Sequence, residues 1–246
     1  MDKKNQEGHD SKKMKSPFQN LGYHLFIYRS YYLSFIYISI LFFELKNYYY
    51  IRNDLTIFIG LSISIIGFLF RCFTIGYVYN NTSGRSTYQG MAAEKLNIYG
   101  SYSMTRNPLY FSNILIVSGI FFANAFSYIT VIVLIVQFLY YYIIIHSEEQ
   151  FLENKFGYDY TDWVININKF IPRISNYCYN DLQFSIKNIV LREYSTFYML
   201  ILAQGLILSN YCHFLIDINS INYFLLFLFI SLYLFTRLTI IYFYEY

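Results

Sequence analysis

Segments without a charged side chain recur along the chain, at residues 30–43, 55–70, 109–145, 194–216 and 218–236. A membrane-spanning helix needs about 20 predominantly apolar residues. The first segment approaches that length if it begins at Leu25 and Arg29 extends its side chain to the membrane surface. The second segment is followed by Arg71 and by a further apolar stretch. We therefore predict membrane-spanning helices over these segments.

The third segment, residues 109–145, is nearly twice as long as the roughly 20 residues that one span requires. Asn124 lies near its middle, in the sequence Ala-Asn-Ala-Phe-Ser, where a tight turn fits between two helices. Asp217 divides the last two segments in the same way. The pattern predicts an all-α, polytopic transmembrane bundle of about six spans.

The positive charges give an orientation for these spans. With the N-terminus in the cytoplasm, all of the eighteen Lys and Arg residues except Lys46 and Arg52 lie in inner segments or at inner helix ends. Cytoplasmic segments of membrane proteins carry such an excess of positive charge. We predict a multi-pass integral membrane protein with both termini in the cytoplasm.

The composition agrees with a membrane protein. Apolar residues make up 56% of the chain and charged residues 13%, and the mean hydropathy is +0.33. A soluble domain carries about 25% charged residues. These values exclude a disordered chain and an ordinary soluble enzyme. The three cysteines are far apart and lack a metal-ligand spacing, and no G-x-G-x-x-G motif follows a strand. We expect neither a metal nor a nucleic acid as a partner.

The turn at Asn124 brings two distant parts of the chain together. In an antiparallel helix pair, the residues just before Leu109 lie beside the residues just after Ile145. The first part ends in Arg106-Asn107-Pro108, and the second contains Glu148-Glu149. A guanidinium and two carboxylates therefore meet at the cytoplasmic surface of the membrane, where they form a candidate site.

Each of these groups has a simpler explanation on its own. Arg106 alone can be a positive charge that determines the membrane topology, and the two glutamates alone can be a solvent-exposed helix end. Asn107 and Pro108 fit the N-cap and first residue of a helix. It is the predicted convergence of the groups that favours a functional site.

An amphipathic helix follows the glutamates. Gly157 can end the helix that carries them. Tyr160, Trp163, Val164 and Ile167 then form an apolar stripe at helical spacing. This stripe predicts a cytoplasmic interfacial helix that covers the open end of the hairpin, although a simple surface anchor has the same pattern.

Two motifs on either side of the long apolar segment resemble those of one family. The first is Gly100-x-Tyr102-x-x-x-Arg106-Asn107-Pro108-x-Tyr110. The second is Glu148-Glu149-x-x-Leu152-x-x-x-Phe156-Gly157-x-x-Tyr160, followed by Phe170-Ile171-Pro172-Arg173. Their order and separation, across about residues 60–173, resemble the isoprenylcysteine carboxyl methyltransferase and phospholipid methyltransferase superfamily. Ser83-Gly84-Arg85 and Leu96-Asn97 are similar to its bacterial members, such as lipid A phosphate methyltransferase.

The resemblance implies that S-adenosylmethionine binds from the cytoplasmic side and that the acceptor arrives from the bilayer. It implies catalytic roles for Arg106 and Glu149, with Arg106 facing the acceptor or the cofactor carboxylate. The family commonly has His where this chain has Asn107. The implied cofactor-binding residues are Gly100, Tyr102, Asn107, Pro108, Tyr110, Glu148 and Glu149.

Methyl transfer is an in-line displacement, so the protein must align donor and acceptor and exclude water. A phosphate or carboxylate acceptor needs no general base near neutral pH and can pair with Arg106. An amine acceptor must lose a proton, and Asn107 in place of His removes one candidate base, which leaves His146 as a substitute. We therefore expect an anionic, lipid-embedded acceptor.

A lipid phosphate such as that of lipid A is the favoured acceptor. A prenylcysteine carboxylate on a lipidated protein is the first alternative, and a phospholipid amine is the second. A non-catalytic membrane interaction protein is an alternative of another class. The bacterial-like motifs favour the bacterial inner membrane as the location, with the endoplasmic reticulum expected for a eukaryotic source.

The predicted organisation has three parts. Residues 1–22 form a Lys-rich polar tail, and residues 23–176 form the methyltransferase core of four spans and the interfacial helix. Residues 177–246 add two spans to which the sequence assigns no role. Membrane lipids are the expected surroundings of all six spans.

Overall fold

The structure, a computed structural model, describes residues 17–46, 54–78, 85–87, 90–124, 128–179, 181–215 and 219–244. Its long helices are α1 (Pro17–Ile27), α2 (Arg29–Lys46), α3 (Asp54–Gly76), α5 (Pro108–Asn124), α6 (Tyr128–Phe156), α8 (Ile186–Leu215) and α9 (Asn219–Tyr244). The shorter elements are strands β1 (Arg85–Thr87) and β2 (Gly90–Ala92), helices α4 (Ser101–Met104) and α7 (Tyr158–Val164), and a 3-10 turn at Ile174–Asn176.

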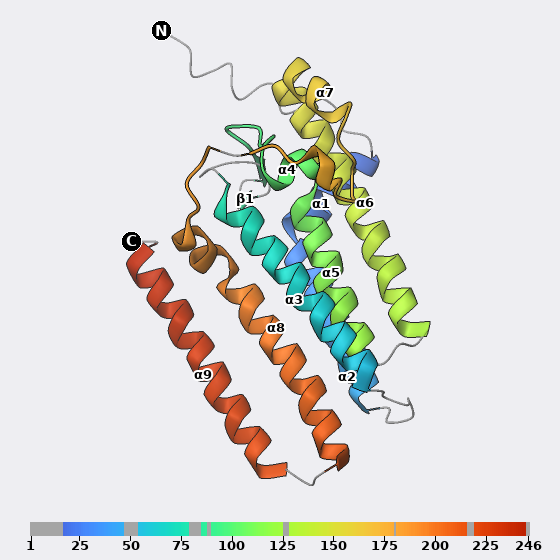
Figure 1. Cartoon of the computed structure of the whole chain (residues 1–246), viewed down its shortest axis with the longest axis vertical. Helices are drawn as coiled ribbons and strands as arrows, with labels where there is room; N and C mark the ends of the chain where they lie inside the picture. Colours follow the sequence, from blue (N-terminus) through green and yellow to red (C-terminus); the bar gives the residue numbers. More distant parts are fainter. Residues whose placement is uncertain are drawn as a thin grey trace.

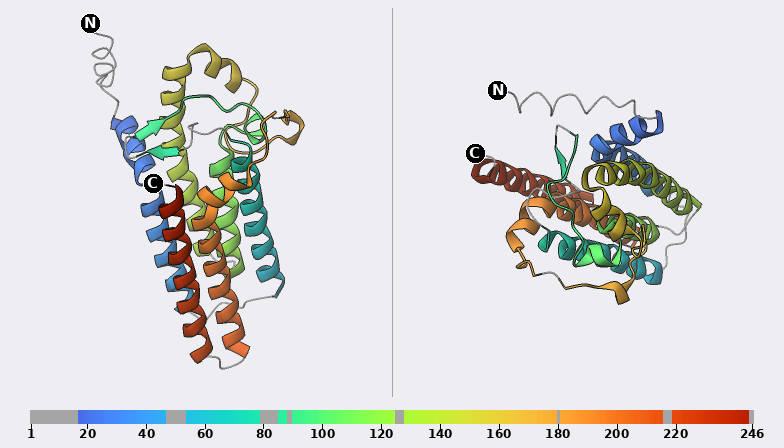
Figure 2. Two further views of the ribbon diagram at one scale, coloured as in Figure 1. Left: turned by 90° about the vertical axis from the view of Figure 1, so that its left-hand side faces the viewer. Right: turned by 90° about the horizontal axis from the view of Figure 1, so that it is seen from above.

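The long helices lie side by side along one axis of the molecule (Figure 1; Figure 2). The short elements α4, α7 and the antiparallel β1–β2 hairpin gather at one end of this bundle. Helices α8 and α9 form an outer layer, with α8 packed on α3 and α5. Apart from the two short strands β1 and β2, the all-α prediction is confirmed for the described residues.

Each predicted apolar segment falls in a helix, including one helix on each side of the turn predicted at Asn124. Asn124 is the last residue of α5, whereas residues 125–127 and Asp217 lie outside the described residues. Among the helices described, α3 and α6 combine the length and hydropathy needed to cross a membrane. The count of six spans and the cytoplasmic position of the interfacial helix stay predictions.

Helices α5 and α6 pair in the predicted antiparallel direction. Gln137 Nε2 of α6 donates to the carbonyl of Asn113 in α5 at 3.1 Å. Nearer the end that carries α4 and α7, Tyr110 Oη donates to Glu148 Oε2 at 3.0 Å. Lower residue numbers on α5 therefore face higher numbers on α6. This register brings the start of α5 beside the carboxylates of α6.

Small residues allow α3 and α5 to approach closely. Gly60 and Gly67 of α3 face α5, and Gly119 of α5 faces α3. A Cβ atom added at Gly119 would lie 2.4 Å from both the carbonyl oxygen of Gly60 and the backbone nitrogen of Ser64. Small residues at such positions let helix backbones touch, which favours helix association inside a bilayer.

Polar contacts fix α8 against α3. Arg71 Nε of α3 lies 2.5 Å from Glu193 Oε2 of α8, and Gln204 Nε2 donates to Ser64 Oγ at 2.8 Å. The two contacts show that α8 runs antiparallel to α3. Helix α9 packs on α8, where Tyr198 Oη and Thr236 Oγ1 form a hydrogen bond of 2.9 Å.

Replacing Gly119 by Val is expected to destabilise the bundle by about 3 kcal/mol, because the new side chain meets backbone atoms of α3. Thermal unfolding of the purified protein in detergent micelles, followed by circular dichroism, measures the effect. Gly205→Ala in α8 is the matched control, since no described atom beyond the local helix backbone and the adjacent residues lies within 4 Å of a Cβ atom there. Equal unfolding midpoints for the two variants would contradict the close α3–α5 contact.

Candidate functional site

A tight turn leads the chain into α4. Gly100 has a φ of 63°, a left-handed conformation that favours glycine. Its N–H donates to the carbonyl of Cys178 at 2.9 Å, and Ser103 Oγ donates to the Gly100 carbonyl at 2.6 Å. Tyr102, two residues later, is buried with 7% of its surface exposed. Gly100 thus shapes the turn that places Tyr102.

A second glycine redirects the chain after α6. Gly157 has a φ of 54°, and it separates α6 from α7, as the sequence predicts. Helix α7 is shorter than the predicted stripe, because it ends at Val164 and Ile167 lies beyond it. Tyr160 and Trp163 pack with Leu152 of α6 in one hydrophobic cluster.

The segment after α7 binds to the start of the α5–α6 hairpin through backbone groups. The N–H of Arg106 donates to the carbonyl of Asn168 at 2.9 Å, and Asn107 Nδ2 donates to the carbonyl of Lys169 at 3.0 Å. Thr105 Oγ1 donates to the carbonyl of Phe170 at 3.0 Å. The chain from α7 to residue 173 therefore covers the open end of the α5–α6 hairpin, where the sequence predicts a covering helix. We call this segment the lid.

Arg106 and the two glutamates converge as the hairpin argument predicts. Arg106 Nη1 lies 3.0 Å from Glu149 Oε1, and Lys169 Nζ lies 2.7 Å from Glu149 Oε2. Glu148 is 8% exposed and accepts the hydrogen bond from Tyr110 Oη. A buried carboxylate needs such partners to offset its desolvation. The two neighbouring carboxylates are held by different groups.

Burial also determines the protonation state of two tyrosines outside the apolar segments. It raises the pKa of Tyr102 and of Tyr160 well above the usual range of a phenol, and the nearby charges of Glu148 and Glu149 act in the same direction. Both side chains therefore stay neutral at physiological pH. Each can donate a hydrogen bond inside the site.

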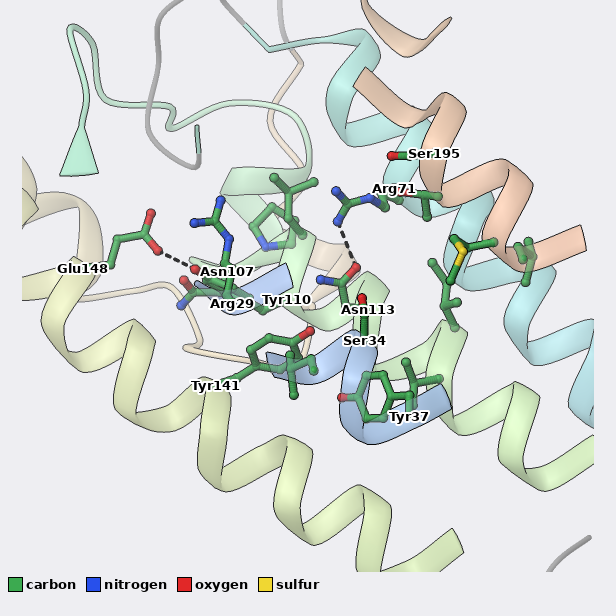
Figure 3. Close-up of a pocket in the computed structure, with 18 of the residues that line it drawn as sticks. Arg29, Ser34, Tyr37, Arg71, Asn107, Tyr110, Asn113, Tyr141, Glu148 and Ser195 are labelled. Carbon is green, nitrogen blue, oxygen red and sulfur yellow. Dashed lines mark hydrogen bonds between the residues drawn. The ribbon is translucent and has the colours of Figure 1, made fainter. Parts of the chain in front are cut away.

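One continuous cavity of about 670 Å³ connects this site to the interior of the bundle. Its volume falls within the range of about 300–1,000 Å³ that is typical of small-molecule sites. Its lining includes the polar groups of Arg106, Asn107, Glu148 and Glu149, together with Tyr160 and Trp163. Many apolar side chains of α2, α5 and α8 also line it. Figure 3 shows part of this lining.

Most of the residues singled out from the motifs line this cavity. They are Tyr102, Arg106, Asn107, Pro108, Tyr110, Glu148 and Glu149. Gly100 is not among the lining residues, although it forms the turn before Tyr102. The geometry thus brings the predicted residues together, while their individual roles stay predictions.

The sequence argument did not select two arginines that line the cavity. Arg29 and Arg71 both lie at its wall, among the side chains of Figure 3. Arg29 Nη1 donates to the carbonyl of Phe26 at 2.8 Å, and its guanidinium lies over the Phe26 ring. The signal was present, because a charged residue within an apolar segment is by default a candidate for a functional site.

The lining fits S-adenosylmethionine, the cofactor that the resemblance implies. Among the described residues, several buried polar atoms have no hydrogen-bond partner, and Arg106 Nε and Trp163 Nε1 belong to lining residues. Buried polar atoms normally find partners, and a bound polar ligand supplies them. Carboxylates suit the ammonium and hydroxyl groups of this cofactor, and aromatic rings suit its adenine.

A comparison with protein families points to the same superfamily as the motifs. The family model described as phospholipid methyltransferase matches residues 55–159, from the start of α3 into α7. No curated protein and no solved structure gives a significant match to the chain. The family is made up of methyltransferases, and together with the apolar helices α3 and α6 it indicates an integral membrane protein. Residues 55–159 therefore match the domain of the phospholipid methyltransferase family, within the superfamily that the motifs resemble.

Proposed function

We propose that this protein is an integral membrane methyltransferase that uses S-adenosylmethionine and methylates an anionic group of a lipid-embedded acceptor. One observation carries the proposal above all others. A single cavity joins the cluster of Arg106, Glu148 and Glu149 to an apolar region between the helices. A polar cofactor and an apolar acceptor can meet in a cavity of this kind.

The proposed position in the membrane follows the apolar segments. The described residues of the five uncharged segments lie in helices, and the sequence places the hairpin opening at the cytoplasmic end. In this arrangement α7 and the segment to residue 173 cover the cofactor end. The acceptor reaches the cavity from the bilayer, between the helices. Both termini lie in the cytoplasm.

The residues around the hairpin opening have separate tasks in the proposal. Glu148 and Glu149 hold the cofactor's polar groups, and Tyr102 and Tyr110 shape its pocket. Lys169 and Arg106 fix the carboxylate of Glu149 by ion pairs at 2.7 and 3.0 Å. The cluster is therefore organised before a ligand binds, which reduces the reorganisation required during the reaction.

The bound cofactor supplies a methyl group on a sulfonium. An oxygen of the acceptor forms the new bond to the methyl carbon while the carbon–sulfur bond breaks, and the electron pair of that bond stays on sulfur. An ionised phosphate or carboxylate releases no proton in this reaction. The chain's own contribution is alignment and exclusion of water, for which the closed end under α7 is suited.

The charges favour an anionic acceptor over an amine. Among the described residues, Arg29, Arg71 and Arg106 line the cavity together with two glutamates. Asn107, at the family's usual His position, donates to the Lys169 carbonyl, so its side chain holds the lid. A lipid phosphate remains the favoured acceptor, and a prenylcysteine carboxylate is the alternative with the same charge.

Membranes that contain the protein, supplied with methyl-labelled S-adenosylmethionine, are expected to transfer label to a lipid fraction. Glu149→Gln should lower the transfer roughly thirtyfold, because a charge-assisted hydrogen bond contributes about 2 kcal/mol. Fractionation into protein, phospholipid and lipid A measures the label and gives the acceptor class.

Glu153→Gln is the matched control, since Glu153 is an exposed carboxylate on the same helix. Equal labelling by Glu149→Gln and the control would show that Glu149 has no part in the reaction. Base-labile label on protein would favour the prenylcysteine carboxylate. Absence of label from the wild type, with every acceptor class supplied, would contradict the enzyme proposal.

Cofactor binding can be followed through Trp163, the single tryptophan of the chain. Because Trp163 lines the same cavity as Glu149, S-adenosylmethionine and S-adenosylhomocysteine are both expected to cause a saturable change in its fluorescence. Trp163→Phe, which removes the signal, is the control. The proposal fails if the wild type shows saturable binding neither by fluorescence nor by equilibrium dialysis with labelled cofactor.

A further inference from the structure

Helix α8 forms one wall of the cavity, although it lies outside the residues that match the family. Its contribution spans three turns and includes Ser195, Met199, Leu200, Ala203 and Leu206. Leu200 is 5% exposed, whereas Met199 and Leu206 are 45% and 38% exposed. The α8 wall therefore extends from the interior of the bundle to its surface. An apolar chain can enter from the bilayer along this wall.

An ion pair attaches α8 to the family domain at the same place. Arg71 Nε of α3 lies 2.5 Å from Glu193 Oε2, and Glu193 is 2% exposed. Arg71 Nη1 also donates to Asn113 Oδ1 of α5 at 2.9 Å. These two bonds use only part of the guanidinium's donors, and Arg71 lines the cavity. The side chain is thus fixed by two helices while it borders the open space.

The position of Arg71 separates it from the proposed cofactor end. In Figure 3, Arg71 and Glu148 lie at opposite sides of the view, with Asn107, Tyr110 and Asn113 between them. The paired glutamates attract the positive groups of a cofactor. Arg71 offers an anion its hydrogen-bond donors on the side of the cavity that α8 encloses. A charge-assisted bond from a guanidinium is the contact that phosphate oxygens prefer.

We propose that α8 completes the acceptor site. In this site Arg71, positioned by Glu193 and Asn113, binds the phosphate of a long-chain lipid, and the lipid chain lies along Met199, Ala203 and Leu206. The inference rests on the proposed function, and it assigns the role of the first helix that follows the family domain. The acceptor selectivity of the protein then depends on residues outside that domain.

The chain-binding wall is tested by filling it. Ala203→Phe should lower kcat/KM for dioleoyl phosphatidic acid in phosphatidylcholine vesicles by about tenfold or more, because the added ring occupies the space of the lipid chain. Methylation of dihexanoyl phosphatidic acid should change less than about threefold on the same energy scale, since its short chains do not reach that far. Leu208→Phe, at an exposed position of the same helix that does not line the cavity, is the control.

Equal effects of Ala203→Phe on both lipids, or no effect on either, would overturn the assignment of α8 while leaving the proposed function intact. If the wild type binds S-adenosylmethionine but methylates no lipid phosphate, the proposed acceptor is wrong and this inference fails with it. These two failures are distinguished because cofactor binding is measured separately through Trp163.

The head-group contact is tested with the double variant Arg71→Gln/Glu193→Gln. A single change would leave one buried charge unpaired and destabilise the bundle, whereas the two amides can keep a neutral hydrogen bond. We expect KM for dioleoyl phosphatidic acid to rise about tenfold, with kcat and the Kd of S-adenosylmethionine changed less than about twofold, since one charge-assisted contact is lost.

If the ion pair between Arg71 and Glu193 has only a structural role, the double variant should change stability or kcat but not KM. A lower unfolding midpoint or kcat with an unchanged KM would therefore overturn the proposal. Weakened cofactor binding with an unchanged acceptor KM would place the cofactor's carboxylate at Arg71 and would overturn the proposal equally.

Inorganic phosphate is the second probe. It should compete only weakly with the wild type if the site requires the lipid chain, and strong competition would show a site for free phosphate.

Discussion

The antiparallel pairing of α5 and α6 is the constraint on which the site depends. The segment 109–145 has no charged residue, and its two helices, α5 and α6, run antiparallel. The observed register then sets Tyr110 opposite Glu148 and brings Arg106 to Glu149. Because buried carboxylates require partners, the same register satisfies the charges of the site. The lid closes on this end through backbone hydrogen bonds of Met104 and Arg106 and side-chain hydrogen bonds of Thr105 and Asn107.

The part of the fold that depends on segments adjacent in the sequence could be predicted from the sequence. An uncharged stretch too long for one helix, with Asn124 near its middle, is sufficient to predict the hairpin and the meeting of Arg106 with the glutamates. Gly157 identified the end of α6, because glycine readily adopts the conformation seen there. The length of α7 was overestimated, since the apolar spacing continues to Ile167 after the helix has ended.

Contacts between distant helices could not be predicted in the same way. The pairing of Arg71 with Glu193 joins residues 122 positions apart, and the intervening chain sets no fixed distance between them. The helices of the bundle are apolar on most faces, so periodicity does not indicate which face meets a neighbour. What the sequence does contain is the charge itself, in an apolar segment where an unpaired arginine is unfavourable. The charge of Arg71 indicates that a partner is needed, but not that α8 supplies it.

The arginines of the cavity share one arrangement that links stability to selectivity. Arg106 faces Glu149 and Arg71 faces Glu193, and the charge of Arg29 acts on Glu148. Such pairs contribute little net stability, because desolvation offsets much of their attraction. Their value lies in fixing donors and acceptors at defined positions around an otherwise apolar space. A charged ligand gains the most binding free energy where a hydrogen-bond donor of such a pair is still unused. For Arg71 this gain depends on α8, so the outer helix contributes to recognition through the same contact that holds it in the bundle.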